Sequence, residues 1–376
     1  DVTKKSFVQS FLESIKQIHK SGIRFVIVSS GGGSNAIASL LRVPGASNSV
    51  LESYIPYSRE SLDFYLMKEP DLYCSKDTSL RMAAKAYSAA KKIDSKTSKT
   101  ALFGIAITAA LSTTYEKQGD HKFHIALQTE DYSKSISCVM KKGTRSREEE
   151  EELVTNFVVN MLLESAGLDF SYPKINEEYV EERVNAKEGW KQIMREEIPY
   201  ITSNNEEPKL IFPGAFNPIH DAHIEMAKLA KNKMLQNVFY EVCIQNADKT
   251  PLSYHQIEST LNQFNKKDQW VLTKAGKFSE KAMMFKDATF IIGADTLLRM
   301  LNERFYSSYK SMIDEFDIFN RQNTNFLVFG RVFDGSFVTL QDINIPSSIE
   351  QRFEGFGEDI FRSDISSTKI RTEESS

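Results

Sequence analysis

The chain has 376 residues, of which 26% are charged and 41% hydrophobic, and its formal net charge at pH 7 is −4. This length exceeds what one hydrophobic core usually organises, so two domains are expected. The slightly acidic balance excludes a general attraction to nucleic acid polymers or to anionic membranes, and neither is expected as a partner.

The cysteines and the apolar runs indicate which cellular compartment to expect. Three cysteines stand far apart with no CxxC pair, which predicts neither a disulfide framework nor a structural zinc site and favours a reducing compartment. The longest apolar run, Ala101 to Leu111, is too short to span a membrane. No secretory signal opens the chain. The expected location is intracellular, cytoplasmic by default, with an organelle left open.

The first part of the chain is expected to form one sheet with helices around it. Apolar residues at helical spacing predict a helix over Lys4–Lys20, and the apolar run Ile23–Val28 predicts a short buried strand. The Gly-rich turn Ser29–Ser34 leads into a predicted helix over Asn35–Leu41. Further strands of this sheet are expected at Ala101–Ala110, Lys122–Gln128 and Ser135–Lys141.

A domain boundary is expected near the middle of the chain. The acidic run Glu148–Glu152 predicts the solvated start of a helix that continues through Leu163, because carboxylates suit the positive end of a helix. From there to Pro208 the hydrophobic pattern thins into turn-rich, polar sequence. One helix is predicted in this stretch, around Tyr179 to Glu196. The predicted domains are residues 1–168 and 209–376, joined by a linker over 169–208.

In the second domain, predicted strands alternate with predicted helices. The strands are expected at Lys209–Phe212, Val238–Ile244, Trp270–Thr273, Ala288–Gly293, Asn325–Phe329 and Phe337–Leu340. Three helices are expected between these strands. One follows the first strand and ends near Leu235, one runs from Ser253 to about Phe264, and one covers Asp295–Leu301. The fold class is therefore α/β, with two domains that each hold a mainly parallel or mixed sheet flanked by helices. Ligands bind such sheets at the carboxyl ends of the strands, where Gly214, Lys249, Lys274 and Gly293 fall.

The segment Gly214 to His223 is the first candidate site. Gly214 would let the backbone bend closely under a phosphate, and the helix that begins near Asp221 would point amide donors at the same place. His220 and His223, three residues apart, share one face of that turn and can each donate a hydrogen bond to phosphate oxygens. An isolated HxxH also occurs as an incidental surface pair or in a metal site. No third ligand stands nearby in sequence, so no metal site is expected.

The segment Ile365 to Arg371 is the second candidate site. Ser366, Ser367 and Thr368 would open a helix, where free amides and hydroxyls can surround a triphosphate. Arg371, one turn on, can bind phosphate oxygens in a bidentate manner. The alternative is a simple serine cap near a chain end. The two segments together predict a nucleoside triphosphate pocket and nucleotidyl transfer, a reaction that needs positioning and charge stabilisation.

These motifs resemble the HxGH-type nucleotidyltransferase superfamily, over about Lys209 to Arg371. Ile292-Gly293-Ala294-Asp295 looks like the family's GxD segment, and the order of motifs looks most like the nicotinamide-mononucleotide adenylyltransferase branch. The resemblance implies a Rossmann-like nucleotidyltransferase fold and transfer of AMP from ATP, with Mg²⁺, to a small mononucleotide, releasing pyrophosphate. It implies that Thr273-Lys274-Ala275 binds the mononucleotide.

By this resemblance, the candidate catalytic residues contact the ATP phosphates from two sides. They are His220, His223 and Arg371. The residues implied in nucleotide binding are Gly214, Phe216, Asn217, Lys249, Gly293, Asp295, Ser366, Ser367 and Thr368. Two positions depart from the family pattern: Ala222 replaces the glycine of HxGH, and Leu301 to Phe305 lacks the family's tryptophan.

Two rival interpretations stay open for the second domain. One is a pseudoenzyme that serves as a structural or accessory subunit of a larger assembly. The other is transfer of CMP or AMP to a different acceptor, such as pantetheine phosphate.

The first domain resembles the carboxy-terminal domain of CinA-type proteins, which include nicotinamide-mononucleotide deamidases. The resemblance rests on Ser30-Gly31-Gly32, Val43 to Ser47 and Tyr57-Ser58, over roughly Phe7 to Ser165. Val28 aligns with the family's catalytic serine and Leu62 with its lysine, so a non-hydrolytic domain is expected. Ser29 or Ser30 is the alternative nucleophile. The glycine run would either hold a phosphate or allow tight packing, and the resemblance implies self-association as a homo-oligomer.

Overall fold

The computed structural model describes residues 2–115, 118–246 and 249–374, with side chains from residue 9 onward. Two compact units make up the chain. The first unit holds residues 1–191 and 248–257, and the second holds residues 192–247 and 258–376. The fold is mixed α/β with two large sheets flanked by helices, as the sequence predicts.

The first unit is built on a six-stranded mixed sheet in the order β2-β1-β3-β4-β5-β6. Its strands are β1 (Arg24–Gly31), β2 (Val50–Tyr54), β3 (Leu102–Ala110), β4 (His121–Gln128), β5 (Tyr132–Met140) and β6 (Tyr179–Asn185). Strands β1 to β3 pair in parallel, and β3 to β6 pair as antiparallel neighbours. The strands expected in this unit are confirmed, and β2 and β6 are additions that the hydrophobic pattern did not predict.

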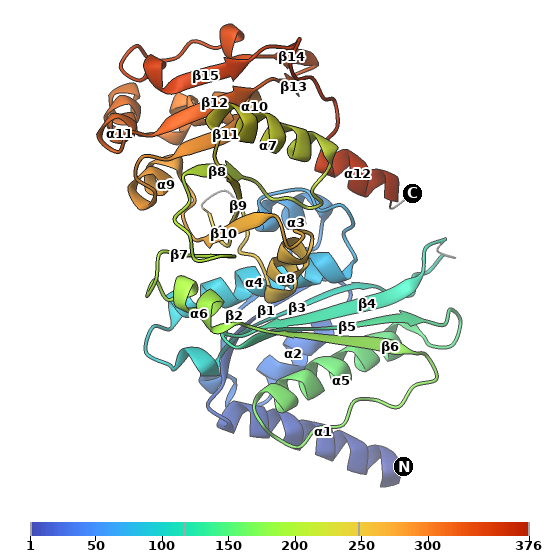
Figure 1. Cartoon of the computed structure of the whole chain (residues 1–376). Helices are drawn as coiled ribbons and strands as arrows, with labels where there is room; N and C mark the ends of the chain where they lie inside the picture. Colours follow the sequence, from blue (N-terminus) through green and yellow to red (C-terminus); the bar gives the residue numbers. More distant parts are fainter. Residues whose placement is uncertain (1, 116–117, 247–248, 375–376) are drawn as a thin grey trace. The chain divides into compact units, whose positions relative to one another are not determined.

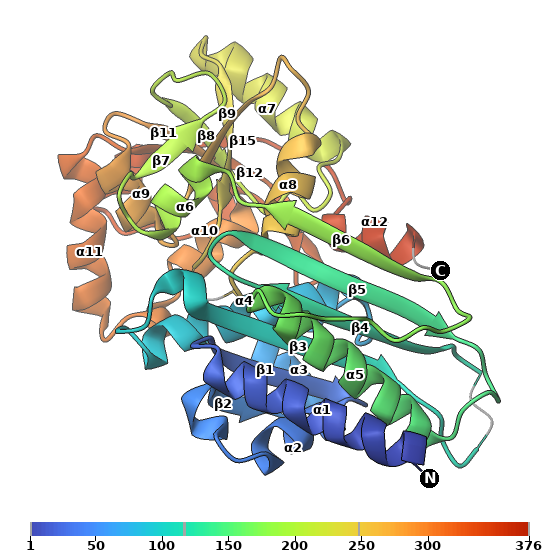
Figure 2. The ribbon, with the colours of Figure 1, turned by 90° about the horizontal axis from the view of Figure 1, so that it is seen from below.

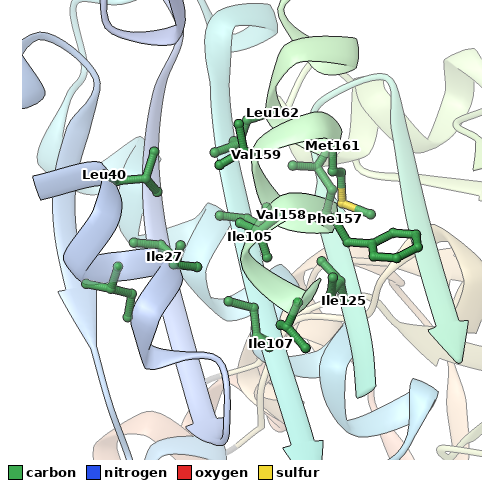
Figure 3. Close-up of a cluster of buried hydrophobic side chains, with 14 of the residues drawn as sticks. Ile27, Leu40, Ile105, Ile107, Ile125, Phe157, Val158, Val159, Met161 and Leu162 are labelled. Carbon is green, nitrogen blue, oxygen red and sulfur yellow. The ribbon is translucent and has the colours of Figure 1, made fainter. Parts of the chain in front are cut away.

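Helices cover both faces of this sheet (Figures 1 and 2). They are α1 (Val2–Lys20), α2 (Ser34–Arg42), α3 (Arg59–Leu66), α4 (Lys76–Ile93) and α5 (Arg147–Ser165), and the short helix α6 (Glu188–Met194) follows β6 in sequence. Ile27, Ile105 and Ile125 point to the face covered by α1, α2 and α5, as Figure 3 shows. The alternate residues, such as Val28 and Ala106, pack against α3 and α4. Alternation along each strand thus divides the apolar side chains between two cores.

The acidic start of α5 is only partly the solvated helix end that the sequence predicts: Glu148, Glu149 and Glu152 are exposed, whereas Glu150 is buried. The Glu150 side chain is 1% exposed, and its carboxylate accepts hydrogen bonds from the Ser112 amide at 2.6 Å and from His121 Nδ1 at 2.8 Å. The neighbouring Glu151 carboxylate accepts the Gly33 amide at 3.0 Å. Buried carboxylates need such partners. These two glutamates therefore hold the loops at the ends of β1 and β3.

The second unit is built on a seven-stranded sheet in the order β15-β12-β11-β8-β9-β10-β7. Its strands are β7 (Tyr200–Thr202), β8 (Leu210–Pro213), β9 (Val238–Cys243), β10 (Gln269–Thr273), β11 (Thr289–Gly293), β12 (Asn325–Phe329) and β15 (Phe353–Phe356). All neighbours pair in parallel except β10 and β7. The sequence correctly predicts β8 to β12 but misses β15.

Helices flank this second sheet as well. They are α7 (Asp221–Met234), the end of α8 (Tyr254–Asn262), α9 (Phe278–Met284), α10 (Ala294–Met300), α11 (Tyr309–Arg321) and α12 (Ser367–Glu374). One core packs α9, α10 and α11 against apolar residues of the strands, including Phe290 and Phe326. The strand expected at Phe337–Leu340 is instead β14 (Ser336–Val338), which pairs only with β13 (Arg331–Phe333) in a small hairpin.

The segment expected to be a linker is structured. A helix was expected around Tyr179 to Glu196, but Tyr179–Asn185 forms β6 at the edge of the first sheet, followed by the short helix α6. Further on, Tyr200–Thr202 forms β7 of the second sheet. The largely polar segment YVEERVN becomes an edge strand because it gains its hydrogen bonds from β5, a distant neighbour in sequence. The predicted domain bounds themselves stay a prediction.

Among the helices of the described residues, none combines the length and the hydropathy needed to cross a bilayer.

Candidate functional site

The topology of the second sheet places the first candidate segment at a switch point. From β8 the chain continues to β9 and β10 on one side, whereas β11 and β12 lie on the other side of β8. In open α/β sheets, ligands bind outside the carboxyl ends of the strands at such a reversal. Here those ends are Pro213 of β8 and Gly293 of β11. The predicted Gly214 turn and the predicted GxD segment therefore follow two adjacent strands.

The turn after β8 is held by its own side chains. The Gly214 amide donates to the Glu241 carbonyl at 3.1 Å. A Cβ at Gly214 would lie 2.7 Å from the ring of Phe216, which has a φ of 47° and is 1% exposed. The space expected for a phosphate beside this glycine is thus filled by Phe216. Because that ring is buried, any contact of Phe216 with a nucleotide would come from its backbone.

The Phe216 ring also packs against the second of the two imidazoles, His223. It meets the His223 ring edge-on at 5.1 Å and the Tyr240 ring at 5.3 Å. The Gln263 side chain closes the turn, because its Nε2 donates to the Phe216 carbonyl at 2.6 Å and its Oε1 accepts the Ile219 amide at 2.8 Å. The backbone leading to the two histidines is therefore fixed at several points.

His220 and His223 lie stacked at the start of α7. Their ring centroids are 3.7 Å apart with an interplanar angle of 22°. The His220 amide donates to His223 Nδ1 at 3.2 Å, so this nitrogen is an acceptor and the ring proton lies on Nε2. His220 is 6% exposed, yet among the described residues neither of its ring nitrogens has a hydrogen-bond partner. A buried imidazole without partners is costly unless a ligand or water satisfies it.

Both imidazoles are neutral near pH 7. Burial lowers the pKa of His223 to about 3, with smaller contributions from His220 and from the positive charge of Arg331. Burial and Arg331 also lower the pKa of His220. A neutral imidazole still donates one N–H, so the pair can offer hydrogen bonds to anionic oxygens without carrying a charge of its own.

The second candidate segment lies against the first. Helix α12 begins at Ser367, as expected, and Figure 1 shows it beside α7. The Ser367 hydroxyl donates to the Pro218 carbonyl at 2.7 Å, and Arg371 Nη1 donates to the Asn217 carbonyl. Ser366 caps the helix by accepting the Lys369 amide at 3.2 Å, and Thr368 accepts from Arg371 at 3.3 Å. The structure thus joins two segments far apart in sequence.

Arg331 is a cation of this site that the sequence analysis missed. It opens β13 directly after β12, and its Nε lies 4.0 Å from Asp295 Oδ1. A Cβ at Gly293 would come within 2.8 Å of the Arg331 side chain and 2.4 Å of Asp295. Gly293 therefore leaves room for this pair, and the charge of Arg331 acts on both histidines. An arginine after an apolar strand was the signal available in the sequence.

Comparison with known families agrees with this geometry. Residues 211–373 match the cytidylyltransferase-like family. The resemblance to the HxGH-type nucleotidyltransferase superfamily is confirmed for this part of the chain. We call residues 211–373 the cytidylyltransferase-like domain. No curated protein sequence matches the chain.

Several solved structures resemble about two-fifths of the chain, with low TM-scores. The competence/damage inducible protein CihA from Agrobacterium tumefaciens is 18% identical, covers 41% of this chain and 94% of its own length, and has a TM-score of 0.34. A competence or damage-inducible protein from Enterobacter asburiae is 15% identical, covers 42% of this chain and 98% of its own, with a TM-score of 0.35. A CinA superfamily protein from Escherichia coli is 13% identical, with a TM-score of 0.32, and covers 40% and 84% of the two chains. These values support no conclusion about activity.

Two further predictions concern Lys249 and the Mg²⁺ expected with ATP. Lys249 is exposed and belongs to residues 248–257 of the first unit, so its predicted role in phosphate binding stays a prediction. Among the described residues, no cluster of three or more His, Cys, Asp or Glu side chains could hold a metal ion. Mg²⁺ commonly keeps its waters and binds through substrate phosphates. The Mg²⁺ that would accompany ATP stays a prediction.

The Gly-rich turn of the first unit fits the packing interpretation. Cβ atoms at Gly31 and Gly33 would lie 2.3 Å from the Ala109 carbonyl oxygen and 2.5 Å from Ile107. The Gly33 amide is already bound by Glu151. The phosphate interpretation would need that carboxylate to move, since it occupies the donor that an anion would use.

The first unit's alternative nucleophiles are used in backbone hydrogen bonds. Ser29 is fully buried and its hydroxyl donates to the Gly32 carbonyl at 3.0 Å. Ser30 donates to the Pro56 carbonyl at 2.9 Å. Val28 and Leu62, which align with the family's catalytic groups, are buried in the core next to α4. No activating base is bonded to either serine among the described residues.

Proposed function

We propose that the cytidylyltransferase-like domain transfers AMP from ATP to a mononucleotide, nicotinamide mononucleotide in the first instance, and releases pyrophosphate. The observation that carries this proposal is the environment of His220. This side chain is 6% exposed with both ring nitrogens unpartnered among the described residues, and it stacks on His223 where α12 meets the Gly214 turn. Two neutral N–H donors beside Arg331 and Arg371 form a site of the kind that binds phosphate oxygens.

In the proposed reaction, a phosphate oxygen of the mononucleotide attacks the α-phosphorus of ATP. A new P–O bond forms as the bond between the α-phosphorus and the bridging oxygen breaks, and pyrophosphate leaves with that oxygen. Negative charge grows on the bridging and equatorial oxygens in the transition state. His220 and His223 would donate hydrogen bonds to these oxygens, while Arg371 and Arg331 would offset the charge of the leaving group. Mg²⁺ would enter with the ATP and neutralise part of its charge.

The acceptor depends on a different part of the domain. The loop after β10, Thr273-Lys274-Ala275, is the expected mononucleotide site, and it follows the strand next to β9 at the same edge of the sheet. Residues at this edge are therefore candidates for the choice of acceptor, and transfer to pantetheine phosphate is the alternative within the same reaction class.

The proposal is tested by incubating the full chain with ATP, Mg²⁺ and each candidate mononucleotide while pyrophosphate release is measured. Release with nicotinamide mononucleotide, and formation of the corresponding dinucleotide, are the expected results. Binding of Mg·ATP without release of pyrophosphate for any acceptor would favour the accessory-subunit interpretation instead.

Ala222, which replaces the family's glycine, is 3% exposed, so its methyl group is accommodated in the interior.

A further inference from the structure

A buried charged pair lies between the Gly214 turn and the loop after β10. Glu241 on β9 and Lys281 on α9 are 1% and 5% exposed, and their carboxylate oxygen and ammonium nitrogen are 2.6 Å apart. Neither residue belongs to a motif that the sequence analysis singled out. A buried ion pair is weak evidence for stability, because desolvation offsets most of the attraction. The pair lies at the edge of the sheet that carries the candidate site, which points to a role other than stabilising the fold.

Glu241 contacts both sides of the candidate site. Its backbone carbonyl accepts the amide of Gly214, the first residue of the turn that leads to the histidines, at 3.1 Å. Its carboxylate accepts the hydroxyl of Thr273, the first residue of the expected acceptor loop, at 2.6 Å. Glu241 on β9 thus bonds the carboxyl ends of the strands on either side of it. Its backbone bonds the residue after β8, and its side chain bonds the last residue of β10.

Lys281 extends this connection along the loop. Besides Glu241, its ammonium donates to the Ala275 carbonyl at 2.8 Å. The Ala275 amide donates to the Thr273 hydroxyl at 3.3 Å, and the Thr273 carbonyl accepts the Ile244 amide at 2.8 Å. The loop is therefore bonded to the pair at two residues, through the hydroxyl of Thr273 and the carbonyl of Ala275, which restricts its movement against β9.

We infer that Glu241 and Lys281 are positioning residues that set the acceptor loop against the Gly214 turn. The inference rests on the proposed function, in which the acceptor phosphate must approach the α-phosphorus in line. Small displacements between two bound reactants lower the rate strongly. The pair touches neither proposed substrate and acts through Thr273, Ala275 and Gly214. Its expected effect is on acceptor KM and on kcat, not on the binding of ATP.

The first test needs no activity. Amide hydrogen exchange is measured for Lys281→Met and for the double variant Glu241→Gln with Lys281→Met. The double variant leaves no unpaired buried charge and so keeps a folded protein available. Exchange at Gly214, Ile244 and Ala275 should accelerate at least about tenfold, the equivalent of one charged hydrogen bond. Unchanged exchange at these amides in a folded variant would overturn the inference.

Lys134→Met is the matched control for this test. Lys134 is also 5% exposed and pairs with Glu164 and Glu181, but it lies in the first unit. It should lower stability to a similar extent while leaving the three amides of the second unit unchanged. Accelerated exchange at those amides in this control would show a general loosening and remove the support for a local role.

The second test uses kinetics and separates the two proposals. If the wild type transfers AMP, the double variant should raise the acceptor KM at least about tenfold and lower kcat, with the Kd for Mg·ATP within about twofold. Equal changes in the acceptor KM and in the Kd for Mg·ATP, or no change in either, would contradict the inference while leaving the proposed function intact. If the wild type transfers nothing, the proposed function fails, and hydrogen exchange alone decides whether the pair fixes the loop.

Discussion

The rings of His220 and His223 stack with their centroids 3.7 Å apart, and the His220 amide bonds His223 Nδ1 at 3.2 Å. Such a pair is disfavoured when both rings are protonated, since two imidazolium ions at this distance would repel each other, and favoured when the rings are neutral. Burial and Arg331 supply that neutrality. The arrangement presents polar nitrogen atoms without a fixed charge at the start of α7.

Replacing His220 by Ala should lower kcat for AMP transfer at least about 100-fold, because a preorganised donor to the transition state is lost. The fold should persist, since the ring nitrogens make no hydrogen bond to the described residues. Pyrophosphate release at saturating substrates measures the effect. His19→Ala is the matched control: this buried histidine bonds Ser49 and Leu40, so its loss should cost about 1–3 kcal/mol of stability and leave kcat unchanged. A His220 variant with the wild-type rate would remove this residue from the mechanism.

Replacing Arg331 by Met should raise the pKa of His223 above its wild-type value of about 3, because a positive charge that opposes protonation is removed. Proton NMR titration of the histidine ring signals measures this directly. The shift should be partial, since burial is the larger cause. An unchanged titration of both His220 and His223 would show that Arg331 exerts no field on the pair.

Mg·ATP should raise the melting temperature of the wild type, because it binds only the folded state. At a ligand concentration of about 100 Kd the gain is about 2.7 kcal/mol. Arg371→Met should reduce this shift, since Arg371 is bonded to the Asn217 carbonyl beside the histidines and offers the site's phosphate a guanidinium. Mg²⁺ alone should produce no shift, because the described residues hold no metal cluster. Equal shifts with Mg²⁺ and with Mg·ATP would contradict the proposed site.

Acid should destabilise the protein between about pH 6.5 and pH 4. Burial lowers the pKa of His19, His124, His220, His223 and His255, to about 4 for His124 and about 3 for His223. The unfolded chain takes up protons near pH 6.5 whereas the folded chain does not, so stability is full above that pH and falls below it, by up to about 1.4 kcal/mol per pH unit for each histidine.

Thermal melts across this range measure the acid dependence. His124→Asn should flatten the slope, because Asn does not titrate and can still bond Ser137, the partner of His124 Nδ1. A variant with the slope of the wild type would show that His124 has the same pKa in the folded and unfolded chains.

Gly104→Ala should destabilise the first unit by about 1–3 kcal/mol, the usual cost of overpacking a core. A Cβ at this position of β3 would lie 2.2 Å from both the Ala83 carbonyl oxygen and the Tyr87 amide nitrogen of α4. Urea denaturation measures the loss. Gly119→Ala is the control, since nothing lies within 4 Å of its Cβ and no change is expected. Equal stabilities for the two variants would mean that α4 can move away from the sheet without cost.

Much of the fold was predictable because it depends on local patterns. Apolar runs identify β8 to β12, and helical spacing identifies α1, since these periodicities are properties of neighbouring residues. Two of the missed edge strands share one cause. Tyr179–Asn185 and Phe353–Phe356 become strands only because a distant strand offers hydrogen bonds at the sheet edge. The propensities of the residues within a segment carry no information about such a distant partner.

The sequence by itself predicted two segments with the residue types of a phosphate site, the first of them directly after a strand of an α/β sheet. Only the tertiary structure decided that Ser367 and Arg371 bond the turn before His220, and that Arg331 acts on the same histidines. It also decided that the Phe216 ring fills the space beside Gly214, and that Glu241 bonds both the Gly214 turn and, together with Lys281, the loop after β10. These relationships join residues distant along the chain, so they exist only once the sheet has brought its strand ends together.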